Sequence, residues 1–229
     1  MVDREGIKQG FYQTMARDAE AAGLLKPLGD EERRQSRIDT MAARPDGAGI
    51  WVFAYGSLMW NPAFNYVEKR TARLHGYHRS FCLQTPIGRG SPDCPGLVLG
   101  LDQGGSVQGV ALRIAEEEAD EELDVIWSRE MLADAYRPTW VTLVDKDGVR
   151  FHAIAFVMRR DCERYAGRLS LEETAGRIAQ ATGRLGPCSE YLERTVSAMD
   201  EIGISDGPMH ALRARVRALK QAHEGRPNE

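Results

Sequence analysis

The sequence predicts an α+β fold, a small mixed β-barrel with helices packed outside it and a helical extension at the N-terminus. Short apolar runs rich in β-branched and aromatic residues fill the middle of the chain, and apolar residues at helical spacing fill its last third. Strands and helices do not alternate regularly, as they would around a parallel sheet. With 229 residues, the chain has the length of one domain with an appendage.

Residues 1–48 differ in pattern from the rest and predict a helical, partly mobile extension. Charged side chains dominate residues 30–37, and the turn-forming sequence Arg44-Pro-Asp-Gly-Ala-Gly closes the segment. We therefore expect a folded domain over residues 49–223 and a disordered tail over 224–229. Apolar residues recur at helical spacing ahead of the charged stretch: Phe11, Met15, Ala19 and Ala22.

The predicted strands begin with Ile50-Trp-Val-Phe-Ala-Tyr, a short apolar run typical of a buried strand. The pair Gly104-Gly105 separates two strand-like runs and predicts a tight hairpin. A second hairpin is expected around Lys146-Asp-Gly, between residues 140–144 and 149–157. The other strand-like runs are 67–74, 80–84, 96–101 and 106–114. Helices are expected at 116–132, 171–182, 189–202 and 209–223.

Composition excludes several classes of function. A net charge of −4 and a pI near 5.8 do not fit a nucleic-acid-binding surface. No run approaches the roughly 20 apolar residues of a membrane span, and the N-terminus lacks the apolar centre of a signal peptide, so we expect a cytoplasmic protein. His75 and His78 have no further ligand nearby, which argues against a metal site. Four scattered cysteines are expected to be free thiols: Cys82, Cys94, Cys162 and Cys188.

The first candidate for chemistry is the turn Tyr55-Gly-Ser-Leu58, at the end of the first predicted strand. Glycine allows close approach to the backbone, and successive amides in such a turn can converge on a carboxylate. Ser57 adds a hydroxyl at the same place. It is a weak candidate for a nucleophile, because its surroundings are not Gly-x-Ser-x-Gly. A purely structural turn is the commoner explanation of such a sequence.

The second candidate is Glu130, which occupies an apolar position of the helix expected at 116–132. An acid pressed against Trp127 would lose its hydration, which raises its pKa toward working pH. The alternative is a structural ion pair in the core with Arg113 or Arg137, and the pattern does not decide between the two. The apolar stripe that includes this position is Leu123, Ile126, Trp127 and Met131.

Two further residues are weaker candidates. Arg89 lies in the Gly/Pro-dense loop 88–96, whose stiffness suits the lip of a pocket, and its charge could meet an acidic substrate. Tyr191 follows Pro187 at the start of a helix and could place a hydroxyl in a pocket. For each, the commoner explanation is structural: a surface loop and an aromatic side chain packed on the core.

Together these residues resemble the ChaC family of γ-glutamylcyclotransferases. The similarity spans about residues 50–200, and the motifs occur in the order typical of the family. Tyr-Gly-Ser-Leu followed later by Arg-Glu is its most specific part. The similar segments are Val52-Phe-Ala-Tyr-Gly-Ser-Leu-Met-Trp-Asn-Pro, Tyr66-Val-Glu-Lys-Arg, Leu74-His-Gly-Tyr-His-Arg-Ser-Phe, Arg89-Gly-Ser-Pro with Pro95-Gly, Val107-Gln-Gly-Val-Ala, Arg129-Glu130 and Glu190-Tyr191-Leu.

The resemblance implies the γ-glutamylcyclotransferase barrel and a lyase without a cofactor. Typically the substrate is glutathione, whose α-amine attacks its own γ-carbonyl and releases 5-oxoproline and Cys-Gly. The resemblance implies that Glu130 is the acid–base residue. The implied substrate-binding residues are Phe53, Ala54, Tyr55, Gly56, Ser57, Leu58, Arg89 and Tyr191.

The segment between Glu130 and Tyr136 keeps the family's tyrosine but lacks its glycine, so the identity of the γ-glutamyl substrate stays open. The alternatives are a cyclotransferase for other γ-glutamyl amines or amino acids, and a non-catalytic module that binds γ-glutamyl metabolites or a protein. The sequence predicts no nucleic-acid or membrane partner. It does not give the oligomeric state, the pathway or the role of residues 1–48.

Overall fold

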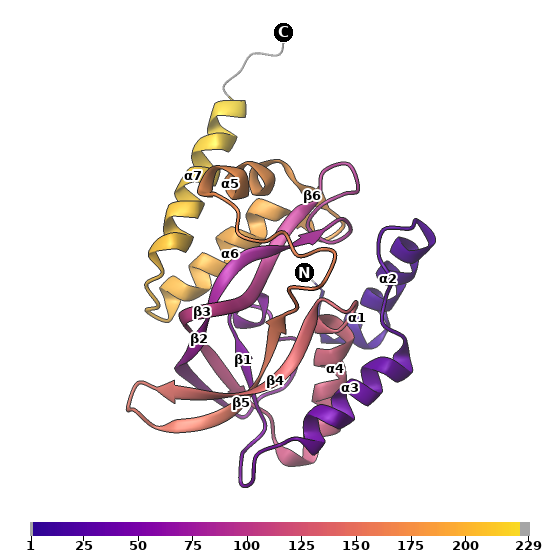
Figure 1. Ribbon diagram of the computed structural model, residues 1–229, viewed down its shortest axis with the longest axis vertical. Coiled ribbons are helices and arrows are strands. Elements are labelled where there is room, and N and C mark those ends of the chain that lie inside the picture. The colour runs from indigo at the N-terminus through magenta and orange to yellow at the C-terminus, as the bar shows by residue number, and fades with distance from the viewer. Residues whose placement is uncertain (1, 225–229) are drawn as a thin grey trace. The chain divides into compact units, whose positions relative to one another are not determined.

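The computed structural model describes residues 2–224 of the chain (Figure 1). These residues form two compact units, each described by itself. The first unit contains the residues up to Ser80 and those from Gly100 to Glu163, and the second contains Phe81–Leu99 and the residues from Arg164 onward. Residues 225–229, most of the predicted tail, lie outside the described residues. The domain limits 49 and 223 stay a prediction.

A closed five-stranded barrel organises the fold, with the strand order β1-β3-β2-β4-β5. Strand β5 returns to β1 and pairs with it in parallel, Val52 opposite Ile154, whereas the β1–β3, β2–β4 and β4–β5 pairs are antiparallel. The predicted mixed barrel is thus confirmed. The strands are β1 (Trp51–Ala54), β2 (Glu68–Thr85), β3 (Gly96–Arg113), β4 (Tyr136–Asp145) and β5 (Arg150–Met158).

The hairpin predicted at Gly104-Gly105 is wrong, because both glycines lie inside the unbroken strand β3. Their φ angles are 101° and 74°, values that favour glycine. A tight turn and a β-bulge both require such angles, so the local sequence fits either. Gly104 O lies 3.0 Å from His78 Nδ1 of the neighbouring strand β2. The runs 67–74 and 80–84 are likewise one strand, β2.

The segment before the barrel is helical and packs within the first unit. It contains α1 (Arg4–Lys8), α2 (Phe11–Ala21) and α3 (Asp30–Ala42). Figure 1 shows α3 running beside α4 (Ala119–Glu130), and Trp127 Nε1 donates a hydrogen bond to Ser36 Oγ at 3.2 Å. Helix α4 is preceded by the short 3₁₀ helix η2 (Glu116–Glu118). The partial mobility of this segment stays a prediction.

The second unit carries the helices of the last third, which begin and end within about two residues of their predicted limits. Ser170 caps α5, since its Oγ accepts a hydrogen bond from Glu173 N at 3.2 Å. The elements are α5 (Leu171–Gln180), β6 (Thr182–Gly183), β7 (Gly186–Pro187), α6 (Cys188–Glu201) and α7 (Gly207–Glu224).

No helix among residues 2–224 combines the length and the apolar character of a membrane-spanning helix. All four cysteines are free thiols, as the sequence predicted.

Candidate functional site

Strand β1 leads directly into the Tyr55–Leu58 turn. Phe53 and Ala54 have no exposed surface, because they belong to the core of the barrel. Tyr55 is also buried, and its hydroxyl donates a hydrogen bond to the backbone oxygen of Phe156 at 2.8 Å. These side chains therefore anchor the strand that precedes the turn.

The turn itself is the 3₁₀ helix η1 (Ser57–Met59). Its first internal hydrogen bond runs from Met59 N to Gly56 O at 2.9 Å, so the amides of Ser57 and Leu58 precede the hydrogen-bonded part of the helix. Gly56 is buried with φ −135°. Glycine is therefore not required here by a left-handed backbone.

Two arginines hold this turn. Arg79 of strand β2 donates from Nε to Tyr55 O at 2.6 Å and from Nη2 to Gln108 O at 2.7 Å. Arg129 of helix α4 donates from Nη2 to Ser57 Oγ at 2.7 Å and from Nη1 to Asn61 O. The turn is thus fixed from the barrel and from a helix at once.

Glu130 is the last residue of α4, and its side chain is 15% exposed. Burial raises the pKa of its carboxyl group, and the Arg129 guanidinium partly opposes this by lowering it. Arg129 Nε lies 3.2 Å from Glu130 Oε1, so the ion pair is with the preceding residue rather than with Arg113 or Arg137. Arg113 pairs instead with Glu68 at 3.2 Å.

Arg129 connects the two parts of the candidate site, and sequence reasoning gave it no role. Its side chain is 7% exposed and contacts both Ser57 and Glu130. The sequence did contain a signal for Arg129, because Arg129 and Glu130 together form one motif of the family resemblance. Periodicity did not find it, because a basic residue in the last turn of a helix is also expected from the helix dipole alone.

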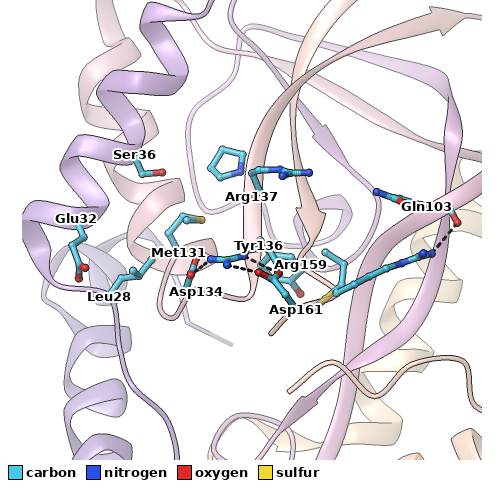
Figure 2. A pocket seen from close by; sticks show the side chains of 13 residues that line it. Leu28, Glu32, Ser36, Gln103, Met131, Asp134, Tyr136, Arg137, Arg159 and Asp161 are labelled. Carbon is cyan, nitrogen blue, oxygen red and sulfur yellow. Dashed lines mark hydrogen bonds and ion pairs between the residues drawn. The ribbon is translucent and has the colours of Figure 1, made fainter. Parts of the chain in front are cut away.

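A cavity of about 380 Å³ borders the segment that follows Glu130, and its lining includes neither Glu130 nor Ser57. Figure 2 shows Leu28, Glu32 and Ser36 on one side and Gln103 on the other. Charged side chains in its wall already pair with one another, since Arg159 forms ion pairs with both Asp134 and Asp161. The remaining lining residues are Met131, Tyr136, Arg137, Pro138, Met158 and Arg160.

The other two predicted site residues lie in the second unit. The Arg89 side chain is 9% exposed, and its guanidinium already has hydrogen-bond partners. Its Nη1 donates to Glu190 Oε2 at 3.1 Å and to Pro187 O at 3.2 Å. Tyr191 is buried, and its ring packs edge-on against Phe81 with centroids 5.9 Å apart. Tyr191 thus packs on the core, as the commoner explanation predicts, whereas Arg89 is buried and ion-paired rather than part of a plain surface loop.

The loop around Arg89 is packed so closely that glycine is required. A Cβ atom on Gly90 would lie 2.1 Å from Gly96 N, and one on Gly183 would lie 2.3 Å from Gly90 O. Both neighbours are backbone atoms that cannot turn aside. This close packing explains the stiffness that the sequence predicted for the loop.

No group of three or more potential metal ligands occurs within residues 2–224. The first unit brings together a carboxyl group with a raised pKa, an arginine and a serine-bearing turn.

The protein is of the α+β class, a closed five-stranded mixed barrel with an acid at the end of a flanking helix. Comparison with known proteins gives its family. The chain belongs to the ChaC-like protein family, whose model matches residues 50–219. The resemblance inferred from the motifs is thus confirmed.

Named relatives and a solved structure agree with this family. The glutathione-specific γ-glutamylcyclotransferase of Escherichia coli strain K12 is 40% identical over 189 residues, which cover 82% of each chain. Glutathione-specific γ-glutamylcyclotransferase 1 of Mus musculus is 33% identical over 162 residues, 69% of this chain and 73% of that one. The crystal structure of a glutathione-specific γ-glutamyl cyclotransferase from yeast shares the fold, with a TM-score of 0.71 and 24% identity over 77% of this chain and 99% of that chain.

Proposed function

We propose that this protein is a glutathione-specific γ-glutamylcyclotransferase, with Glu130 as its acid–base residue. The observation that carries the proposal is a mostly buried carboxyl group with a raised pKa, joined through Arg129 to the Ser57 turn. The names and identities of the bacterial and mouse relatives support the choice of substrate.

The reaction is an intramolecular aminolysis. The α-amine of the γ-glutamyl group attacks the γ-carbonyl carbon, a five-membered lactam forms, and the amide bond to cysteine breaks. The Glu130 carboxylate takes a proton from the ammonium group, which frees the amine to attack, and a second proton leaves this nitrogen through the same carboxyl group as the lactam forms. The departing cysteine nitrogen gains both protons when the C–N bond breaks and leaves as an ammonium group, so atoms and protons balance without water. The substrate supplies its own nucleophile, which means that the protein must mainly hold it in a curled conformation.

The Tyr55–Leu58 turn is proposed to hold the substrate through its backbone and the Ser57 hydroxyl. Amides and a hydroxyl at this place can bind the α-carboxylate or the γ-carbonyl oxygen, where negative charge develops. Phe53, Ala54 and Tyr55 contribute through the strand that they anchor, since their side chains are buried. Roles for Arg89 and Tyr191 in substrate binding stay part of the proposal.

The proposed reaction requires neither metal nor cofactor. We also propose a cytoplasmic location, which the four free thiols support because a reducing compartment keeps cysteines unpaired. Neither a nucleic-acid partner nor a membrane is part of the proposal.

Incubation of the purified protein with glutathione tests the function, with 5-oxoproline and Cys-Gly measured as products. We expect both in equal amounts, at the same rate before and after exhaustive chelation. A parallel series of other γ-glutamyl amines and amino acids tests specificity: turnover of these with glutathione untouched would favour the broader cyclotransferase. Binding of γ-glutamyl compounds without any lactam would favour a binding module.

A further inference from the structure

Arg129 contacts both elements to which the proposed function assigns chemistry. From the last turn of α4 it donates to Ser57 Oγ at 2.7 Å and to Asn61 O, and its Nε lies 3.2 Å from Glu130 Oε1. Its donors form a rigid planar fork, so these contacts constrain direction as well as distance. Only 7% of the side chain is exposed, so the guanidinium is largely shielded from solvent.

We propose that Arg129 is the positioning residue of the cyclisation site, because it fixes the turn that holds the substrate relative to the acid that moves the proton. This inference rests on the proposed function. It adds a residue that acts through Ser57 and Glu130 without bonding to the substrate.

The contact with Arg129 also determines what the Ser57 hydroxyl can do. Because Oγ accepts a hydrogen bond from a cation, the hydroxyl hydrogen points away from the guanidinium and remains available to an acceptor oxygen of the substrate. The guanidinium cannot accept the hydroxyl proton, and its charge lowers the electron density on Oγ. Arg129 therefore makes Ser57 a hydrogen-bond donor to the substrate and a poor nucleophile.

Lactam closure is sensitive to such positioning. The amine, the carbonyl carbon and the proton acceptor must meet in one arrangement, and a displacement of about 1 Å can cost about 100-fold in rate. Ser57 and Glu130 are 73 positions apart in the chain. Arg129 supplies a direct connection between them.

Steady-state kinetics on glutathione with Arg129→Gln, Ser57→Ala and the double variant test the inference. We expect Arg129→Gln to raise KM about tenfold and to lower kcat by at least about tenfold, since substrate holding and proton transfer both depend on it. Ser57→Ala should then add less than about twofold in the Arg129→Gln background. Arg129→Lys should restore only part of the activity, because one ammonium group cannot reproduce the fork.

Arg37→Gln is the matched control. Arg37 holds the opposite end of α4 through Asp120 at 2.9 Å, and its side chain is 17% exposed. We expect KM and kcat within about twofold of wild type for this variant, because the hydrogen bonds and ion pair of Arg37 within residues 2–224 go to Asp120 and not to the turn or the acid.

If the wild type is active, two results would overturn this inference and leave the proposed function standing. One is an unchanged KM in Arg129→Gln, and the other is a double variant in which the effects of the Arg129 and Ser57 substitutions multiply. A purely structural role would reduce the fraction of active molecules and leave KM unchanged. If Arg129→Gln does not fold, Arg129→Lys takes its place in the cycle, and the same two criteria apply. A wild type that forms no lactam overturns the proposed function, and the inference with it.

Discussion

Helix α4 holds a buried glutamate in its first turn and a partly buried one at its last residue, and the two carboxyl groups have different surroundings. Glu122 and Glu130 are eight residues apart, which is slightly more than two helical turns. The Glu122 side chain is 1% exposed, and its oxygens accept hydrogen bonds from Asn65 N at 2.9 Å, from Asn65 Nδ2 at 3.1 Å and from Arg4. The Glu130 side chain is 15% exposed, and within residues 2–224 its ion-pair partner is Arg129.

The difference indicates which acid is structural and which can do chemistry. A carboxylate whose lone pairs are occupied by three donors holds its neighbours in place and has little capacity left for a substrate. Within residues 2–224, Glu130 has the Arg129 ion pair and no other charged partner, and part of its side chain is exposed. Burial of an acid alone therefore does not distinguish a structural acid from a catalytic one, and the remaining hydrogen-bonding capacity favours Glu130 for the proposed role.

Replacement of Glu130 by Gln should have the largest effect. Gln keeps the shape of the side chain but cannot exchange a proton, so kcat on glutathione should fall by roughly 10²–10⁴-fold. Substrate should still bind, as measured by ligand-induced thermal stabilisation. More than about a tenth of wild-type turnover would show that another group moves the proton.

Replacement of Ser57 by Ala should have an intermediate effect. The substitution removes one hydroxyl and leaves the amides of the turn, so kcat/KM should fall roughly ten- to a hundredfold, the value of one hydrogen bond to a charged group. Asn65→Ala is the matched control, because Asn65 donates to Glu122 near the other end of α4. It should lower the melting temperature and leave kcat/KM unchanged. If Ser57→Ala abolished turnover altogether, a nucleophilic serine would replace the pocket that we propose.

Replacement of Glu122 by Gln should change stability and leave catalysis unchanged. The variant keeps the side-chain shape but replaces one acceptor oxygen with a donor, which conflicts with donors that already point at it. We expect a loss of about 1–3 kcal/mol in the free energy of unfolding, measured with denaturant. Turnover per folded molecule should stay within about twofold of wild type. A large fall in kcat with stability unchanged would reverse the assignment of the two acids.

Much of this arrangement follows from local sequence pattern. The apolar stripe of the helix marked Glu130 because an acid stands where an apolar residue is expected, and the end of the first strand marked Ser57. The same reasoning passed over Glu122, which lies in the acidic run Glu116–Asp124 and looks like a residue of a solvated face. Its partners Arg4 and Asn65 are 118 and 57 positions away, and only folding brings them together.

The continuation of strand β3 through Gly104-Gly105 and the contacts of Arg129 were hidden for related reasons. Two glycines with positive φ suit a turn and a bulge equally, and strand pairing decides between them. A basic residue in the last turn of a helix has a sufficient local explanation, although Arg129 makes contacts that are 72 and 68 positions away. Long-range polar contacts are thus the part of the site that the sequence leaves open.

The pH dependence of stability should give the smallest effect and tests Glu130 without any substrate. Burial raises the pKa of this carboxyl group above its ordinary value of 4.5, against the opposing charge of Arg129. Between 4.5 and the raised pKa, the unfolded chain has released this proton and the folded chain still holds it. The unfolded state then binds fewer protons, so the contribution of Glu130 to stability falls as pH rises through this window and is constant above it. Glu130→Gln lacks this titration, and denaturation curves from pH 4 to pH 8, roughly the range in which a perturbed glutamate titrates, should show the wild type losing stability relative to the variant. A difference that grows in favour of the wild type with pH would mean that Glu130 is stabilised as an anion, and a flat difference would mean that folding leaves its pKa unchanged. Either result would contradict the effect of burial.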